Sequence, residues 1–421
     1  MKKYNGKKLL ILAGAAVHSK LVNAAKELGV YTIVTDYLPS SPAKEIADES
    51  WMLNISDIDG IVNKCRAEGI DGVLNFCIDP AQRPYQMITE RLGLPCYGTK
   101  EQFFTLTDKP TFKEFCRKNG VDVIPEYNEK DIELNKVEYP LFIKPSDSRG
   151  SRGQSICYSR EGTKEAIAQA RKESSNGSVV IEKYMGDKQD FSMTYFLCDG
   201  IPYLTRTCDR YLGRVQDNLN KQCIAAIAPS QYSTFYLNNV DQRVRGMIKA
   251  LGLKNGPVFM QGFIDGDTVR FYDPGLRFPG GETELFLKQS TGVDLMKLLV
   301  EFALTGSIND EKLNNDLFKF NGMHSIQMDF TCRPGKIGKF VGLEEINANP
   351  LVSSCFCRYE NGEIVPDSGD VRQRVCEIGL LIDQETTVRN AVSWVQSKFD
   401  VLDEHGKSML VSPLNSSLLN Y

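Results

Sequence analysis

The first hundred residues alternate short, continuously apolar segments with segments of helical spacing, and this alternation limits the fold more than any other feature. Apolar, β-rich runs occupy residues 9–13, 31–35 and 72–76, whereas helical spacing occupies residues 21–28 and 58–68. Strands that are apolar on both faces need cover on both faces, as in parallel sheets joined by crossover helices. We therefore expect an α/β chain that begins with a parallel-sheet domain.

Length, composition and charge are those of an ordinary globular protein. A chain of 421 residues can form two or three domains, and 42% of its residues are hydrophobic and 25% charged. A net charge of −4 gives no sign of a surface for nucleic acid or acidic lipid. Apolar runs stay short of the ~18 residues of a membrane helix and of the ~7–15 of an export signal. We expect a cytoplasmic protein with no nucleic-acid or membrane partner.

Cysteine and histidine are arranged in a way that argues against common metal and catalytic sites. The twelve cysteines are scattered without a CxxC pair, and only Cys355 and Cys357 lie close together, so reduced thiols are expected. The three histidines are His18, His324 and His405. They offer little material for a zinc site or a Ser-His-Asp triad.

The first strand-to-helix turn raises the alternative of a nicotinamide dinucleotide site. Asp36 follows Gly14 at about the distance expected of a ribose-binding acid. The turn at residues 14–18 lacks the second and third glycines that allow a pyrophosphate to approach the backbone. No Walker A sequence occurs either, which disfavours a P-loop enzyme.

Two consecutive segments suit the binding of phosphate groups. Lys144 lies in the short apolar strand expected at residues 139–145, where its amine could lie beside phosphate oxygens or, as on an edge strand, point to water. Residues 146–153 follow, with two glycines, two serines and two arginines. Such a composition suits a mobile loop over a triphosphate, although surface turns often share it.

A third segment, residues 179–186, is an apolar strand that ends in Glu182, Lys183, Tyr184 and Met185. A strand end of this kind can hold a flat base between apolar side chains while a carboxylate accepts from the amino group of the base. A strand that simply runs into a hairpin would show the same pattern.

A fourth feature is a hairpin. Strand-like residues 259–264 and 269–273 are separated by the turn Asp265-Gly266-Asp267. The hairpin would place Gln261 and Asp273 on neighbouring strands, beside Arg277. Oxygen ligands and an arginine together would suit a magnesium-bound triphosphate.

In this order, the four features resemble the ATP-grasp superfamily, close to its carbamoyl-phosphate-synthetase and biotin-carboxylase branch. The resemblance implies a Rossmann-like pre-ATP-grasp domain at residues 1–105 and a two-lobed ATP-grasp domain at 106–305. It implies a small α+β domain at 306–421, where Arg333-Pro334-Gly335-Lys336-Ile337 resembles the biotin-carboxylase C-terminal domain. The implied cofactors are ATP and Mg²⁺.

The resemblance also implies a role for each candidate residue. Lys109 and Lys144 would contact the phosphates, and Arg277 would meet the phosphate or an acyl-phosphate intermediate, so that Lys144 and Arg277 are the catalytic candidates. The remaining nucleotide contacts would come from the glycine-rich loop, the adenine segment and one ribose ligand: Ser148, Gly150, Ser151, Gly153, Glu182, Lys183, Tyr184, Met185 and Asp190.

The metal ligands are where the chain departs from this family. The family usually has Glu on the first hairpin strand and Glu-x-Asn on the second, whereas this chain has Gln261 and Asp273-Pro274-Gly275. One anionic ligand and the asparagine are missing, and Glu282 is a candidate substitute. Gln261 and Asp273 remain the expected metal ligands, and the number of metal ions is open.

The implied reaction activates a small-molecule carboxylate as an acyl phosphate and transfers it to an amine. Arg206, Arg210 and Arg214 could bind the carboxylate bidentately or form a solvated basic face. A catalytically degenerate nucleotide-binding protein and a nicotinamide-dependent oxidoreductase remain alternatives. The substrates and the oligomeric state, a homodimer included, are not determined by the sequence.

Overall fold

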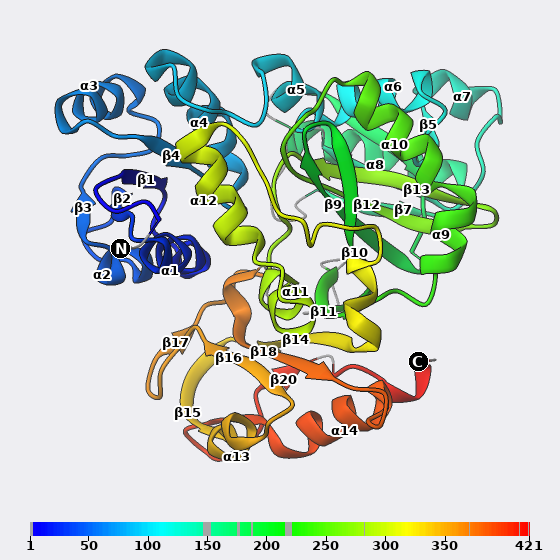
Figure 1. Ribbon diagram of the computed structural model, residues 1–421. Helices are drawn as coiled ribbons and strands as arrows, with labels where there is room; N and C mark the ends of the chain where they lie inside the picture. Colours follow the sequence, from blue (N-terminus) through cyan, green and yellow to red (C-terminus); the bar gives the residue numbers. More distant parts are fainter. Residues whose placement is uncertain are drawn as a thin grey trace.

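A computed structural model of the chain describes residues 3–145, 153–174, 177–186, 188–214, 221–281, 283–369, 371–411, 413–419 and 421. Within these ranges the strands form four sheets, and helices pack around them (Figure 1). No helix in the described ranges combines the length and the apolar character needed to cross a membrane.

The N-terminal sheet is parallel, in the order β3-β2-β1-β4. Its strands and the helices around them are β1 (Lys8–Leu12), β2 (Tyr31–Thr35), β3 (Glu49–Trp51), β4 (Gly72–Leu74), α1 (Ser19–Leu28), α2 (Pro42–Ile46), α3 (Ile58–Glu68) and α4 (Asp79–Leu92). Residues 9–12 of β1 are fully buried, as expected of a strand covered on both faces. The predicted parallel-sheet domain is confirmed.

Helix α12 (Leu295–Thr305) returns late in the chain to pack against α1 and β4 of this first sheet (Figure 1). The contact is close: a Cβ atom at Gly72 would lie 2.7 Å from the carbonyl oxygen of Ala303. A glycine in β4 is what lets the helix backbone approach the strand. The first sheet is therefore completed by a segment that the sequence resemblance assigned to the ATP-grasp domain.

A small antiparallel sheet, in the order β5-β8-β6-β7, follows in the chain. Its elements are β5 (Glu126–Tyr127), β6 (Leu141–Pro145), β7 (Ser155–Cys157), β8 (Val179–Lys183) and the helices α5 (Lys100–Thr105), α6 (Lys109–Lys118), α7 (Glu129–Glu133) and α8 (Arg160–Glu173). The buried side of α8, with Ile167 and Ala170, packs on Leu141 and Ile143 to form a separate small core.

The largest sheet has nine strands, in the order β13-β12-β9-β10-β11-β14-β18-β16 with β20 beside β14. The strands are β9 (Asp190–Cys198), β10 (Ile201–Arg214), β11 (Lys221–Ala228), β12 (Gly256–Asp265), β13 (Thr268–Gly275), β14 (His324–Cys332), β16 (Val352–Cys357), β18 (Arg374–Ile382) and β20 (Leu410–Val411). Helices α9 (Ser233–Asn239), α10 (Asp241–Ala250) and α11 (Thr283–Thr291) accompany it. The sheet thus runs from the predicted ATP-grasp domain into the C-terminal region.

The C-terminal region adds a three-stranded sheet, β17-β15-β19, and two helices (Figure 1). Its elements are β15 (Gly335–Val341), β17 (Ile364–Val365), β19 (Asp400–Asp403), α13 (Leu343–Ala348) and α14 (Val388–Lys398). Strand β15 ends at Val341. Gly342 has φ +81°, and this left-handed conformation turns the chain into α13.

The residues around Val123 form no regular strand, and Val123 makes only an isolated bridge to Phe271. The segment from Gly120 to Pro125 is held instead by single hydrogen bonds to β13, such as Ile124 N–H to Phe271 O at 3.2 Å. This linker ties the small antiparallel sheet to the hairpin that carries Asp273.

Candidate active site

Lys109 and Asp273 bring the two lobes of the predicted ATP-grasp core into contact. Lys109 is the first residue of α6, a helix start held by Asp108, whose side chain accepts from Thr111 N–H at 3.0 Å, and by Pro110. Its Nζ lies 3.1 Å from Oδ1 of Asp273 on β13, and both side chains remain partly exposed. The pair is therefore accessible to a ligand.

The electrostatic surroundings of Lys109 show which other groups gather here. Burial would lower the pKa of Lys109, but Asp273 first, and then Glu182 and Asp79, outweigh it and raise the pKa. Asp273 thus contacts the ammonium group, and Glu182 and Asp79, from two other parts of the chain, add to the negative potential there. A positive side chain in this setting stays charged across the physiological range.

Glu182 on β8 is buried, with 3% exposure, and pairs with two lysines. Its Oε2 accepts from Lys144 Nζ at 2.7 Å, and its Oε1 accepts from Lys113 Nζ. Burial disfavours the charged carboxylate, yet Lys144 and Lys113 overcome this and lower the pKa of Glu182. The predicted phosphate lysine and the predicted adenine carboxylate therefore lie side by side.

Lys113 was not among the residues found from the sequence. It lies on α6 one helical turn after Lys109, is 2% exposed, and also donates to Oε1 of Glu126 at 2.7 Å. Residues four apart share one face of a helix, so the spacing from Lys109 is the signal that could have found it. Because Lys113 is buried and pairs with two carboxylates, its role is structural: it compensates the negative charge of Glu182.

The rest of the predicted adenine segment lies directly after Glu182. Lys183 Nζ is 2.7 Å from Oε2 of Glu138, and the backbone N–H groups of Lys183 and Tyr184 donate to Pro125 O and Pro140 O at 3.0 and 2.9 Å. Met185 is buried, with 4% exposure. The segment is thus anchored on both sides, which gives it a definite position next to Glu182.

Asp190 belongs to a second polar network at the start of β9. Its Oδ2 lies 2.8 Å from Arg210 Nη1 and 3.1 Å from the Tyr272 hydroxyl, which in turn lies 3.3 Å from Oε1 of Gln261. Burial raises the pKa of Asp190, and Arg210 and Tyr272 only partly oppose this. Among the described residues, its Oδ1 has no hydrogen-bond partner. The predicted ribose and metal residues are therefore linked through one tyrosine.

The hairpin predicted from the sequence is present, with a shift of register next to Gln261. Gln261 on β12 pairs directly with Asp273 on β13. Together they offer one amide oxygen and one carboxylate on adjacent strands, which are the hard oxygen ligands that Mg²⁺ prefers.

Arg277 is held by a residue from the N-terminal region. Its Nε and Nη2 lie 2.5 and 3.0 Å from the two carboxylate oxygens of Asp79, and its guanidinium lies 4.6 Å from the centre of the Phe259 ring. Arg277 is 8% exposed, whereas the Asp79 side chain is 62% exposed. Asp79 opens α4, where the sequence indicates only a helix start, so its role as a partner of Arg277 could not be predicted.

Several other predicted residues can be placed only in part. Ser148, Gly150, Ser151 and Glu282 lie outside the described residues, as does the side chain of Arg214. Gly153 has φ +69°, and a Cβ atom there would lie 2.9 Å from Cγ of Pro145. Arg206 is buried on β10, near Cys208, whose Sγ is 2.9 Å from Arg206 Nη2.

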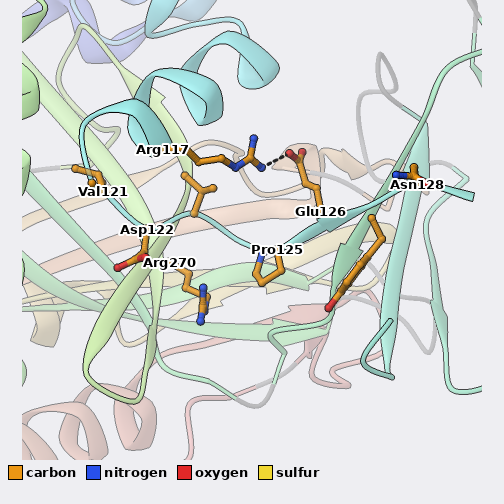
Figure 2. A pocket seen from close by; sticks show the side chains of 10 residues that line it. Arg117, Val121, Asp122, Pro125, Glu126, Asn128 and Arg270 are labelled. Carbon is orange, nitrogen blue, oxygen red and sulfur yellow. Dashed lines mark hydrogen bonds and ion pairs between the residues drawn. The ribbon is translucent and has the colours of Figure 1, made fainter. Parts of the chain in front are cut away.

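An open depression of about 690 Å³ adjoins this site (Figure 2). It is lined by the linker at residues 120–128 together with Arg117 and Arg270, and Figure 2 shows Arg117 reaching Glu126, at 2.6 Å. Its lining includes none of the residues expected to contact the nucleotide. Because Glu126 shares Lys113 with Glu182, the depression is a neighbour of the candidate site and not the site itself.

Comparison with known proteins finds similarity to a family in part of the chain. Residues 108–234 match the family described as carbamoyl-phosphate synthase L chain, ATP binding domain. A formate-dependent phosphoribosylglycinamide formyltransferase from Wolinella succinogenes is 21% identical over 266 residues, which are 59% of this chain and 64% of that relative. The match therefore leaves about a third of that relative uncovered.

Solved structures with the same fold cover nearly the whole chain. An L-amino acid ligase from Bacillus licheniformis has a TM-score of 0.77 at 18% identity and covers 95% of this chain and 100% of its own. The biotin carboxylase domain dimer of the Hydrogenobacter thermophilus 2-oxoglutarate carboxylase, solved with MgADP, ADP and bicarbonate, has a TM-score of 0.74 at 18% identity, covering 96% of this chain and 91% of its own. The ATP-grasp fold predicted from the sequence is confirmed.

Proposed function

We propose that this chain, an ATP-grasp protein of the carbamoyl-phosphate-synthetase and biotin-carboxylase branch, is an ATP-dependent ligase. It would activate a small-molecule carboxylate as an acyl phosphate and transfer it to an amine or a similar nucleophile, forming a carbon–nitrogen bond. The observation that carries the proposal is the convergence on Lys109 of Asp273, Glu182 and Asp79, which come from the hairpin, the small sheet and the N-terminal region.

In this proposal Lys109 and Lys144 bind the phosphates of ATP. Lys144 is now paired with Glu182, which keeps a second lysine partner in Lys113, so Lys144 can turn to a phosphate without leaving Glu182 uncompensated. Phosphoryl transfer needs mainly positioning and neutralisation of oxygen charge. Two lysines that approach from separate elements meet this need.

Mg²⁺ would be held by Asp273 and Gln261. One carboxylate and one neutral amide oxygen form a weak protein site for this ion, which usually keeps several waters and binds through substrate phosphates as well. We therefore propose that Asp273 and Gln261 would hold the metal only together with a bound nucleotide. Its chemistry would be to neutralise charge on the transferring phosphoryl group.

The remaining assignments follow the order of the chain. Adenine would lie against the segment from Glu182 to Met185, and the ribose near Asp190. Arg277, oriented by Asp79, would meet the transferred phosphoryl group or the acyl phosphate. The proposed domain limits are residues 1–105, 106–305 and 306–421.

The substrates, the location and the oligomeric state of the protein are also proposed. We propose small-molecule carboxylate and amine substrates and a cytoplasmic location. Because the comparable biotin carboxylase domain was solved as a dimer, we also propose a homodimer, which light scattering of the purified chain would test.

The function is tested by supplying pairs of carboxylates and amines with ATP and Mg²⁺ and measuring phosphate release. We expect ADP and phosphate to appear in equal amounts only with a matching pair. Arg277→Gln should lose this release, whereas Arg333→Gln, in the C-terminal region, should keep it. Nucleotide binding without ADP release for any pair would contradict the ligase assignment.

That outcome would favour a second candidate, a nucleotide-binding protein without catalysis. The observation in its favour is Gln261, which supplies no negative charge and lies 3.3 Å from the Tyr272 hydroxyl. Gln261→Glu would restore an anionic ligand. A gain of metal-dependent turnover in that variant alone would support this second candidate.

The nicotinamide alternative is disfavoured by the position of Asp36. Its Oδ2 accepts from Gly14 N–H and its Oδ1 from Leu38 N–H, both at 2.8 Å, and the residue is 8% exposed. A ribose-binding acid must be accessible to its ligand, whereas Asp36 is buried and accepts hydrogen bonds from the backbone. Tighter binding of NAD than of ATP in a titration would reverse this conclusion.

A further inference from the structure

Three cysteine side chains from two adjacent strands meet in the C-terminal region. Cys355 and Cys357 lie on β16, and Cys376 lies on β18, with all three sulfur atoms within 4.8 Å of one another. Cys357 and Cys376 are direct partners in the strand register, and their sulfur atoms are 3.3 Å apart. Figure 1 shows β16 and β18 side by side, and they form one end of the nine-stranded sheet.

The strand geometry explains why the thiols point to one place. Alternate residues of a strand share one face, so Cys355 and Cys357 project together, and the residue opposite Cys357 projects with them. Phe356, between them, pairs with Glu377 and faces the other way. The cluster is therefore a property of the β16–β18 pairing, and Cys355-Phe356-Cys357 supplies two of its members.

One side of the cluster is buried, and the other side, called its rim here, is partly open to solvent. Cys376 is fully buried, whereas Cys355 and Cys357 are half-buried at the edge of the second core. No other His, Cys, Asp or Glu of the described residues offers a ligand atom to the group. A bound ion would therefore have three protein ligands and one side from which a water or a small ligand could approach.

We propose that Cys355, Cys357 and Cys376 form a trithiolate site for a soft metal ion, zinc or monovalent copper. Thiolate sulfur is the ligand that selects these ions over Mg²⁺ and Ca²⁺. Zinc–sulfur bonds of about 2.3 Å in tetrahedral geometry place the sulfur atoms roughly 3.8 Å apart. The sulfur–sulfur distances in the structure run from 3.3 Å to at most 4.8 Å, a range that includes this value. Small side-chain rotations therefore suffice to bind the ion.

Binding is a proton exchange without any redox step. Each thiol loses its proton to solvent as its sulfur bonds the metal, and three Cys thiolates replace waters of the incoming ion. Because the ion would join β16 to β18, it would also stabilise the edge of the nine-stranded sheet. The site is independent of the proposed ligase activity.

The test uses the full-length, reduced protein with Zn²⁺ alone and, separately, with Cu(I) under anaerobic conditions. An excess of Mg²⁺ is added to occupy sites made of oxygen ligands. The affinity for Zn²⁺ or Cu(I) is then measured by competition with a chromophoric chelator. We expect one tightly bound ion per chain and a rise in the unfolding temperature. Cobalt substitution should give the ultraviolet absorption of thiolate–cobalt charge transfer.

The variants separate the cluster from the other thiols. Cys355→Ser and Cys357→Ser, both at the rim, should each weaken metal binding by roughly 100-fold or more, since loss of outer-shell partners alone costs about 10–100-fold. Cys96→Ser is the matched control, because Cys96 is also half-buried and lies outside the cluster, with its Sγ 3.1 Å from Gly98 O. Its affinity should equal that of the wild type.

Two results would overturn the proposal. One is equal metal affinity in the wild type and in both rim variants, with unchanged circular dichroism as proof of folding. The other is a wild-type protein that holds neither Zn²⁺ nor Cu(I) after complete reduction. Loss of ligase activity in any assay would bear on the proposed function alone, since no nucleotide enters this measurement.

Discussion

Lys109 Nζ lies 3.1 Å from Asp273 Oδ1, so the first residue of α6 meets a residue near the end of β13. The contact joins a predicted phosphate ligand to a predicted metal ligand. An ammonium group and a carboxylate at this distance attract each other and so hold each other in place.

Asp273→Asn should abolish the magnesium dependence of ATP binding and any turnover. Asn keeps the shape but removes the only carboxylate of the Gln261–Asp273 pair, and Mg²⁺ prefers charged oxygen ligands. Calorimetric titration of ATP with and without Mg²⁺ measures the effect. Asp267→Asn, exposed in the turn of the same hairpin, should keep the dependence. A variant at position 273 with full magnesium-dependent turnover would show that the hairpin is not the metal site.

Lys144→Ala should weaken ATP binding by roughly 1–3 kcal/mol, the range for losing a hydrogen bond to a charged group. Fold should be retained, because Glu182 keeps Lys113 as a partner. Lys164→Ala provides a matched control, since Lys164 is exposed on α8 of the same lobe. Equal calorimetric affinities in the wild type and a folded Lys144→Ala protein would rule out the phosphate role.

Lys113→Met should destabilise the protein itself by roughly 3 kcal/mol. Removal of one partner from a buried ion pair costs about 3–5 kcal/mol, and the lower end applies because Lys144 still pairs with Glu182. Chemical denaturation at neutral pH gives the free energy of unfolding. Lys118→Met, on the exposed side of the same helix, should change it by no more than about 0.5 kcal/mol. Similar values for the two variants would contradict the structural role of Lys113.

Asp329 predicts a pH dependence of stability. Burial raises its pKa to about 6, and Arg374, whose Nη2 is 3.0 Å from Oδ2, only partly opposes this. Between the unfolded value near 4 and about 6, the folded state binds more protons, so this residue makes stability fall as pH rises, by at most roughly 3 kcal/mol. Above about 6 its contribution is constant.

Asp329→Asn should therefore gain stability relative to the wild type between pH 4 and 7. Denaturation at a series of pH values measures the difference, and Asp316→Asn, an exposed acid, serves as the control. A difference between Asp329→Asn and wild type that does not change with pH would show that Asp329 titrates normally.

Much of the fold could be predicted because it depends on local patterns. Apolar runs and helical spacing located β1, β2, α1 and α3, because the hydrophobic period of a helix or strand can be read from consecutive residues. The hairpin itself was also predictable, because a short Asp-Gly-Asp turn between two strand-like segments joins neighbouring strands. The direct pairing of Gln261 with Asp273 was not, because it depends on a shift of register next to Gln261.

Contacts between distant segments were not predictable in the same way. Asp79 reads in the sequence as the start of a helix, and only the packing of α4 near β13 makes it the partner of Arg277. Lys113 is one of many lysines until β8 brings Glu182 to it. Each pairing depends on the orientation of whole elements, which no short window of sequence contains.

The sequence by itself determined the element types, the order of the nucleotide motifs and the family resemblance, because these depend on residues close together in the chain. Tertiary structure alone decided which charges compensate one another and which thiols meet. Cys376 shows the difference: it lies 19 positions from Cys357, yet their sulfur atoms are 3.3 Å apart. Strand pairing, driven by burial of the sheet face, sets that distance, and burial is a property of the folded chain as a whole.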